Sequence, residues 1–437
     1  MRLAVAIVAL GLQGVALAQV FETPAVLEPI RAIAGESRLA AWRSTGASIA
    51  SITSIRTTPP LPFPMVVGVV GEPGMRNLHV VIPPATPAGE YTIDVVGRDV
   101  DERPISAELH VTVDAVMVSA AATSARVPVI LLNGFQLACS TTDSTVAASV
   151  GTFGQLAALL QSDGAPVLFF NNCSYGDISI EQLAGQLNAY INTLHYTDGT
   201  PVIQADLVAH SMGGLISRAY LAGKSSVSGS FAPPSNPKVH KFVAIATPHF
   251  GSFQAGNIGA QESEMVRGSQ VLWDLATWNQ GQDDLRGVDA LAVIGNAGTY
   301  GTTNAASDGV VSLTSGSLDF ARPDQRTRIV PYCHVTPGFL SGLGMSCSSS
   351  RGIADIDTAS HLTAQIVRSF LADTSAWQSI GTTPSQNPFL SIYGGAFAAL
   401  KGSNDVYFRD LTSVQFDNGA SQLLIIWLLQ LPPMGSV

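Results

Sequence analysis

The sequence ADLVAHSMGG at residues 205–214 decides the fold. Its first half is an apolar run typical of a buried strand, and residues 213–221 continue with the apolar spacing of a helix. A serine between such a strand and helix is typical of a nucleophile elbow, a strained turn that lifts the hydroxyl above the sheet edge. The positions two before and two after the serine must be small, because strand and helix nearly touch there. Ala209 and Gly213 meet this requirement, so we predict that Ser211 is a nucleophile.

Further apolar runs without alternation lie on both sides of this segment, as expected for strands buried on both faces. Helical spacing of apolar residues, at 153–160 and 178–194, falls between several of these runs. Strands that alternate with helices predict βαβ units, and therefore an α/β fold with a mostly parallel sheet and helices on both faces. The predicted strands are residues 127–132, 166–170, 205–209, 242–246, 290–294 and 328–332.

Four segments together resemble the α/β-hydrolase superfamily, and within it the secreted bacterial triacylglycerol lipases and esterases. The resemblance covers residues 127–377 and implies a serine carboxylic-ester hydrolase, a lipase acting on acylglycerols, that needs no cofactor. The chain departs from the pattern where such lipases usually have His-Gly, because Asn133 and Gly134 stand there. The four segments are VPVILLNGF (127–135), LVAHSMGGLISRAYL (207–221), IATPHFGS (245–252) and SDGVVS (307–312).

The resemblance places the acid of a catalytic triad at Asp308, which follows Ser211 in the chain order Ser, Asp, His of this fold. Two histidines after the acid are candidates for the base. His334 directly follows the predicted strand at residues 328–332, whereas His361 begins an amphipathic helical pattern. We favour His334 because both its order in the chain and its position after a strand fit the fold.

The resemblance also places an oxyanion hole at the backbone N–H groups of Phe135 and Met212. In this mechanism His334 takes the proton of Ser211, the serine attacks the ester carbonyl, and water then releases the acid. A lipid acyltransferase or a deacylase of lipid anchors would use the same triad with a different acyl acceptor. A non-catalytic exported binding protein is a further alternative, although the sequence contexts of Ser211 and Asp308 count against it.

Residues 251–287 form an insertion between predicted strands that is rich in apolar side chains. Two interpretations stay open: a lid that opens at an oil surface, or a packed helix pair that belongs to the core. No ligand spacing predicts a metal site. The carboxylates available if calcium were bound, as in related lipases, are Asp319, Asp324 and Asp355.

Residues 19–120 show the period-two alternation of β-strands separated by Pro/Gly turns, which predicts an antiparallel, immunoglobulin-like β-sandwich. The stretch PAGEY at residues 87–91 resembles a turn in which a tyrosine tucks its hydroxyl against the corner. A small-residue linker at 120–126 leads into the hydrolase region at 127–377. Residues 379–437 return to turn-rich composition and are predicted to form a small β-rich segment.

The first 18 residues, MRLAVAIVALGLQGVALA, are typical of a secretory signal peptide with an A-x-A cleavage site. No later run reaches the roughly 18 apolar residues of a transmembrane helix, so we expect a secreted or periplasmic protein. An even number of cysteines in an exported chain predicts disulfides. Cys139 and Cys173 each follow a predicted strand whose end lies at the same sheet edge, so we predict that they pair, and that Cys333 pairs with Cys347.

The composition argues against two classes of binding partner. Charged residues make up only 12% of the 437 residues, against roughly 25% in typical soluble domains. The net charge of −10 argues against nucleic-acid binding and against docking on anionic lipid through basic clusters. The expected partner is a lipid or ester substrate, and the sequence predicts no oligomeric state.

Overall fold

The computed structural model describes residues 25–42, 49–71, 77–137, 139, 141–227, 229–252, 254–256, 258–278, 285–300, 305–318, 326–336 and 346–382. Several predictions lie outside these residues: the signal peptide at 1–18, nearly all of the C-terminal segment at 379–437, and two candidate calcium ligands, Asp319 and Asp324.

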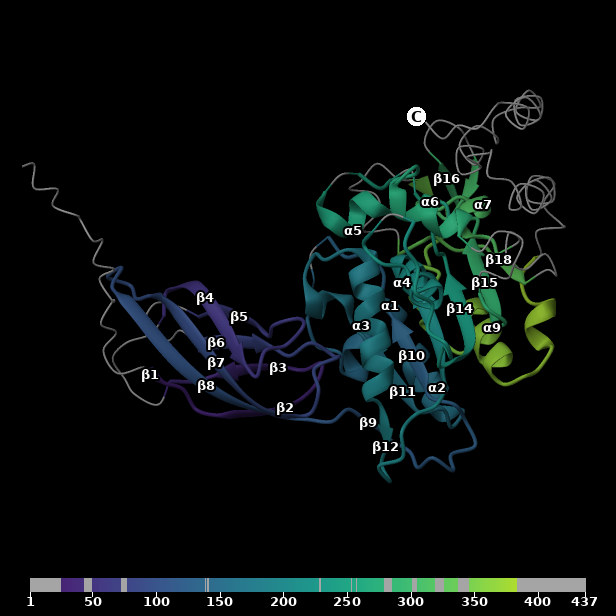
Figure 1. Ribbon diagram of the computed structural model, residues 1–437. Helices are drawn as coiled ribbons and strands as arrows, with labels where there is room; N and C mark the ends of the chain where they lie inside the picture. The colour runs from purple at the N-terminus through teal and green to yellow at the C-terminus, as the bar shows by residue number, and fades with distance from the viewer. Residues whose placement is uncertain are drawn as a thin grey trace, which may run out of the picture.

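A six-stranded parallel sheet forms the centre of the larger part of the molecule (Figure 1). Its strand order is β11–β10–β13–β14–β15–β18, and every neighbouring pair runs parallel. Each of the predicted apolar runs forms one of these strands, which confirms the predicted parallel sheet. The strands are β10 (Val129–Leu132), β11 (Val167–Phe170), β13 (Ala205–His210), β14 (Val239–Ile245), β15 (Asp289–Gly295) and β18 (Thr327–Val330).

Helices cover both faces of this sheet. Successive side chains along each strand point to opposite faces, so the apolar strands present side chains that must be buried on both sides. In β10, Ile130 and Leu132 pack into one apolar layer, and Val129 and Leu131 pack into the other. These two helical layers and the parallel sheet support an α/β-hydrolase fold. The first layer contains α3 (Ile180–Thr193), α4 (Met212–Ala222) and α6 (Gln270–Thr277), and the second contains α1 (Val150–Phe153), α2 (Leu156–Ser162) and α9 (Leu362–Leu371).

Two smaller sheets precede this region, joined to it through β9 (Met117–Val118), which pairs with β12 (His195–Tyr196). The Tyr91 hydroxyl donates a hydrogen bond to the Pro87 carbonyl at 2.8 Å, as predicted for that turn. An immunoglobulin-like arrangement stays a prediction. The first sheet holds β1 (Ala25–Val26), β2 (Ile30–Ile33), β4 (Ser51–Thr58), β7 (Gly89–Arg98) and β8 (Pro104–Asp114), and the second holds β3 (Ser37–Ala40), β5 (Val66–Val70) and β6 (Asn77–Val81).

The prediction of an antiparallel sandwich is wrong at one edge. Strands β1 and β2 both pair with β8 in the parallel direction. The long chain connections from β1 and β2 to β8 permit this direction. Only a tight hairpin turn would require its two strands to run antiparallel.

The insertion after β14 forms a packed helix pair, α5 (Gly259–Glu264) and α6. Val271, Leu272 and Leu275 of α6 are buried in the same apolar layer as α3 and α4, and Met265 joins them. These four side chains of the insertion therefore agree with the packed interpretation, whereas Val266, Trp273 and Trp278 are half-buried.

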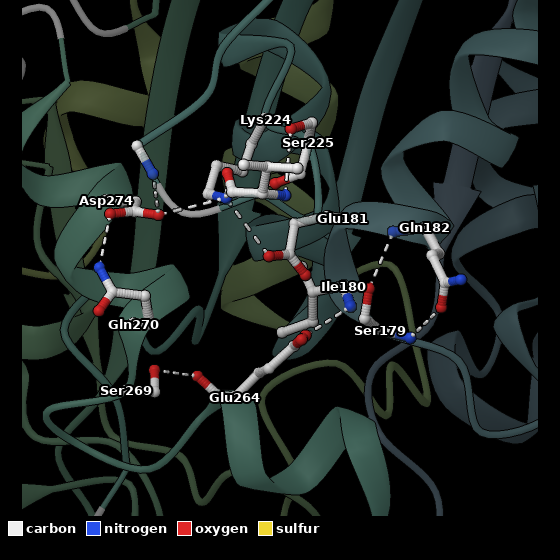
Figure 2. Close-up of polar contacts among 12 residues, drawn as sticks. Ser179, Ile180, Glu181, Gln182, Lys224, Ser225, Glu264, Ser269, Gln270 and Asp274 are labelled. Carbon is white, nitrogen blue, oxygen red and sulfur yellow. Dashed lines mark hydrogen bonds and ion pairs between the residues drawn. The ribbon is translucent and has the colours of Figure 1, made fainter.

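A buried polar cluster joins this helix pair to α3 and to the end of α4 (Figure 2). Lys224 Nζ lies 3.5 Å from Glu181 Oε1 and 3.2 Å from Asp274 Oδ2, and the three side chains are 1%, 8% and 5% exposed. Glu264 Oε2 accepts a hydrogen bond from the Ile180 N–H at 2.6 Å. Burial, together with the neighbouring Glu181 carboxylate, raises the pKa of Glu264 to about 8.

The Glu264→Gln variant should therefore flatten the pH dependence of stability. In the unfolded chain this carboxyl ionises near pH 4.3. A folded-state pKa above the unfolded value contributes stability that is fully present below the unfolded pKa and is lost as pH rises to the folded pKa. We expect the wild-type melting temperature to fall by a few degrees more than that of Glu264→Gln between about pH 5 and pH 8. The exposed Glu28→Gln serves as the control, and parallel curves for all three proteins would contradict the expectation.

Candidate active site

Ser211 lies on a strained turn between β13 and α4. Its φ of 54° and ψ of −124° are unusual for a residue other than glycine. The turn is possible because glycines follow it. A Cβ added to Gly213 would lie 2.7 Å from the Leu132 carbonyl oxygen, and one added to Gly214 would overlap the Thr247 side chain. The structure therefore supplies the physical cause of the predicted strand–turn–helix pattern.

The three predicted triad side chains form one continuous chain of hydrogen bonds. His334 Nε2 lies 3.0 Å from Ser211 Oγ, and His334 Nδ1 lies 2.7 Å from Asp308 Oδ2. The other carboxylate oxygen, Asp308 Oδ1, accepts hydrogen bonds from the N–H groups of Val310 at 2.9 Å and Val311 at 2.7 Å. All three side chains are buried, so water competes little for these contacts.

A small antiparallel sheet that the sequence patterns do not reveal positions Asp308 and His334. Asp308 follows its strand β17 (Ala305–Ser307), which pairs with β16 (Gly298–Tyr300), and β16 pairs with β19 (Ser346–Cys347). Cys333, next to His334, forms a disulfide with Cys347 of β19. The second disulfide joins Cys139 to Cys173, so both predicted pairings are confirmed.

The alternative base, His361, lies away from the nucleophile. Its Nε2 is 3.2 Å from the Gly352 carbonyl oxygen, and its ring stacks on Tyr332 with centroids 4.2 Å apart. Burial lowers the pKa of His361. Of the two candidates, the structure brings only His334 to Ser211.

His210, the residue before Ser211, contacts both the backbone carbonyl and the ring of His334. Its Nε2 lies 3.2 Å from the His334 carbonyl oxygen, and the two rings are 4.8 Å apart. Burial lowers the pKa of His210 well below its usual range, and the neighbouring His334 acts in the same direction. A neutral His210 then donates its Nε2–H to that carbonyl and fixes the backbone of the base. The pKa of His249 is also lowered well below its usual range, by burial and by the nearby Arg218.

The two predicted oxyanion donors lie near Ser211. Met212 is its neighbour in the chain, and Phe135 follows Gly134, which lies against Ser211 in space. Met212 is the first residue of α4, so its N–H belongs to the unpaired donors of a helix start. A Cβ on Gly134 would lie 2.8 Å from Ser211 Cβ. No described residue accepts a hydrogen bond from the backbone N–H of Phe135 or Met212. Their role as an oxyanion hole stays a proposal.

Among the described residues, no group of three or more His, Cys, Asp or Glu side chains is arranged to hold a metal ion. The remaining candidate calcium ligand, Asp355, accepts a hydrogen bond from the Thr336 hydroxyl. In the same part of the chain, no helix is long and apolar enough to cross a membrane.

Comparison with known families adds one match. Residues 171–283 match the family described as "Putative serine esterase (DUF676)". This match includes Ser211 and covers about a quarter of the chain, but it ends before Asp308 and His334. The family match and the Ser–His–Asp geometry together support hydrolase activity of the serine esterase type.

No curated protein matches the chain, and similar solved structures share little sequence with it. The apo form of esterase 2 from Thermogutta terrifontis is 12% identical and has a TM-score of 0.34, with 59% of this chain and 87% of that chain covered. An esterase from Pyrobaculum calidifontis is 11% identical, with a TM-score of 0.28 and coverage of 71% and 86%. The GspB Siglec domain is 14% identical, with a TM-score of 0.17; 24% of this chain covers 64% of that domain. Because these identities and TM-scores are low, the support for the fold comes from the strand order and connections of the central six-stranded sheet.

Proposed function

We propose that this protein is a secreted serine carboxylic-ester hydrolase, and that it acts as a lipase on acylglycerols. The observation that carries the proposal is the hydrogen-bonded chain from Ser211 through His334 to Asp308. A serine within 3.0 Å of an imidazole nitrogen, whose other nitrogen contacts a carboxylate, has the arrangement that serine hydrolases use to form an acyl-enzyme.

The side chains and the two backbone donors have distinct roles in this mechanism. His334 Nε2 takes the proton as Ser211 Oγ attacks the ester carbonyl, while Asp308 holds the Nδ1–H tautomer and stabilises the imidazolium. The N–H groups of Phe135 and Met212 would bind the oxyanion of the tetrahedral intermediate. His334 then protonates the leaving alcohol and activates the water that releases the acid.

The choice of an acylglycerol is supported by the four segments of the chain that resemble secreted bacterial lipases. Secretion is supported by the two disulfides and by the pattern of residues 1–18.

The substrate test uses tributyrin and p-nitrophenyl esters of several chain lengths, each with and without an added alcohol acceptor. We expect the full chain to release free acid from the esters, and the Ser211→Ala variant to release none above background. Transfer of the acyl group to the alcohol without release of free acid would indicate an acyltransferase instead of a hydrolase. Wild type that is as inactive as Ser211→Ala would leave a binding protein as the better interpretation.

A further inference from the structure

Three asparagines form a buried network behind the loop that follows β10. Asn133 Nδ2 donates to Asn171 Oδ1 at 2.9 Å, and Asn133 Oδ1 accepts the Asn172 N–H at 2.9 Å. Asn172 Nδ2 then donates to the Gly134 carbonyl oxygen at 2.9 Å. The three side chains are 1–2% exposed, so each amide is committed to these contacts and not to water.

The last of these contacts fixes the direction of one peptide group. In a planar trans peptide, the C=O and the N–H point in opposite directions. Because the Gly134 carbonyl points toward Asn172, the N–H of Phe135 in the same peptide points away from Asn172. Ser211 lies against Gly134 and leaves no room for a Cβ there. The Asn172 amide thus selects one of the two orientations of this peptide beside the nucleophile.

The network is held in place by its surroundings. Asn171 Nδ2 donates to the carbonyl oxygens of Thr141 at 3.0 Å and Asp143 at 2.8 Å, and the Cys139–Cys173 disulfide spans the same two segments. The smaller β domain contacts this loop as well, because the Ser37 N–H and hydroxyl both donate to Asp143 Oδ1, at 2.7 and 2.6 Å.

We infer that Asn172 is a positioning residue for the proposed oxyanion hole: its amide, held by Asn133 and Asn171, orients the Gly134–Phe135 peptide so that the Phe135 N–H faces the oxyanion. This inference rests on the proposed ester hydrolysis at Ser211. It gives a physical role to Asn133, which stands where related lipases have histidine.

The experiment compares wild type, Asn172→Ala and Asn172→Asp on p-nitrophenyl butyrate and on its thiono analogue, which carries C=S in place of C=O. Asn188, an exposed asparagine of α3, supplies the matched control Asn188→Ala. We expect kcat on the oxygen ester to fall about 10²-fold or more in both Asn172 variants, with KM within about twofold of wild type. Asn188→Ala should match wild type.

The ratio of the oxygen-ester rate to the thiono-ester rate separates positioning from loss of folded protein. Sulfur accepts hydrogen bonds weakly, so a correctly aimed N–H favours the oxygen ester. The ratio does not depend on the folded fraction, and it should fall at least about tenfold in both Asn172 variants. An unchanged ratio, or kcat within about threefold of wild type, would overturn the inference. Wild type inactive on both esters would instead overturn the proposed function.

Discussion

The His334→Ala variant is expected to hydrolyse tributyrin at least about 10³-fold more slowly than wild type. The reason is that His334 Nε2, 3.0 Å from Ser211 Oγ, is the group placed to take the serine proton. Without it, the hydroxyl must lose its proton to water, and the leaving alcohol has no acid. Initial rates at saturating substrate measure this loss, and KM should change far less than kcat.

The matched control for this prediction is His361→Ala. His361 is buried against Tyr332 and bonds to the Gly352 carbonyl, so its loss should lower the melting temperature while the folded enzyme keeps most of its kcat. Rates are normalised to the folded fraction found by thermal melting. The assignment of the base is wrong if His361→Ala abolishes turnover in folded protein and His334→Ala does not.

The Asp308→Asn variant should lose about 10³–10⁴-fold in kcat, although it removes only a charge and keeps the shape. Asp308 Oδ1 accepts two backbone N–H groups, and Oδ2 contacts His334 Nδ1. An asparagine must keep its only oxygen toward the two N–H donors, so its NH₂ faces Nδ1. The imidazole then adopts the Nε2–H tautomer, which cannot accept the proton of Ser211.

The control for this variant is Asp101→Asn, which changes an exposed carboxylate in a distant β-turn. It should keep wild-type kcat, so that the change in net charge by itself is shown to be harmless. Asp308→Asn with kcat within about tenfold of wild type would mean that the carboxylate does not set the tautomer of His334.

The central sheet and the strained turn at Ser211 could be predicted from the sequence because their signals are local. Apolar runs such as residues 205–209 are long enough to indicate strands buried on both faces. The steric demand of the elbow falls on residues within two positions of Ser211. The Cys139–Cys173 pairing was predictable for a different reason, since parallel strands place their carboxyl ends at one edge of the sheet.

The rest of the site depends on contacts between distant residues, for which the sequence carries no period or spacing. His334 and His361 both follow the acid, and only the fold places one of them at Ser211. Asn133 and Asn172 are 39 positions apart, and side-chain bonds to backbone groups leave no pattern. Glu181, in the same way, looks like an ordinary charge on a helix surface until Lys224 is brought against it.

The most direct test of the proposed ester hydrolysis is covalent labelling of the full chain with a serine-directed alkyl phosphonate, followed by peptide mass spectrometry. We expect one phosphonyl adduct per chain, located on Ser211, with at least about 10³-fold slower labelling of His334→Ala and none of Ser211→Ala. Absence of labelling in wild type, under conditions that label a control lipase, or an adduct on another residue, would contradict this expectation.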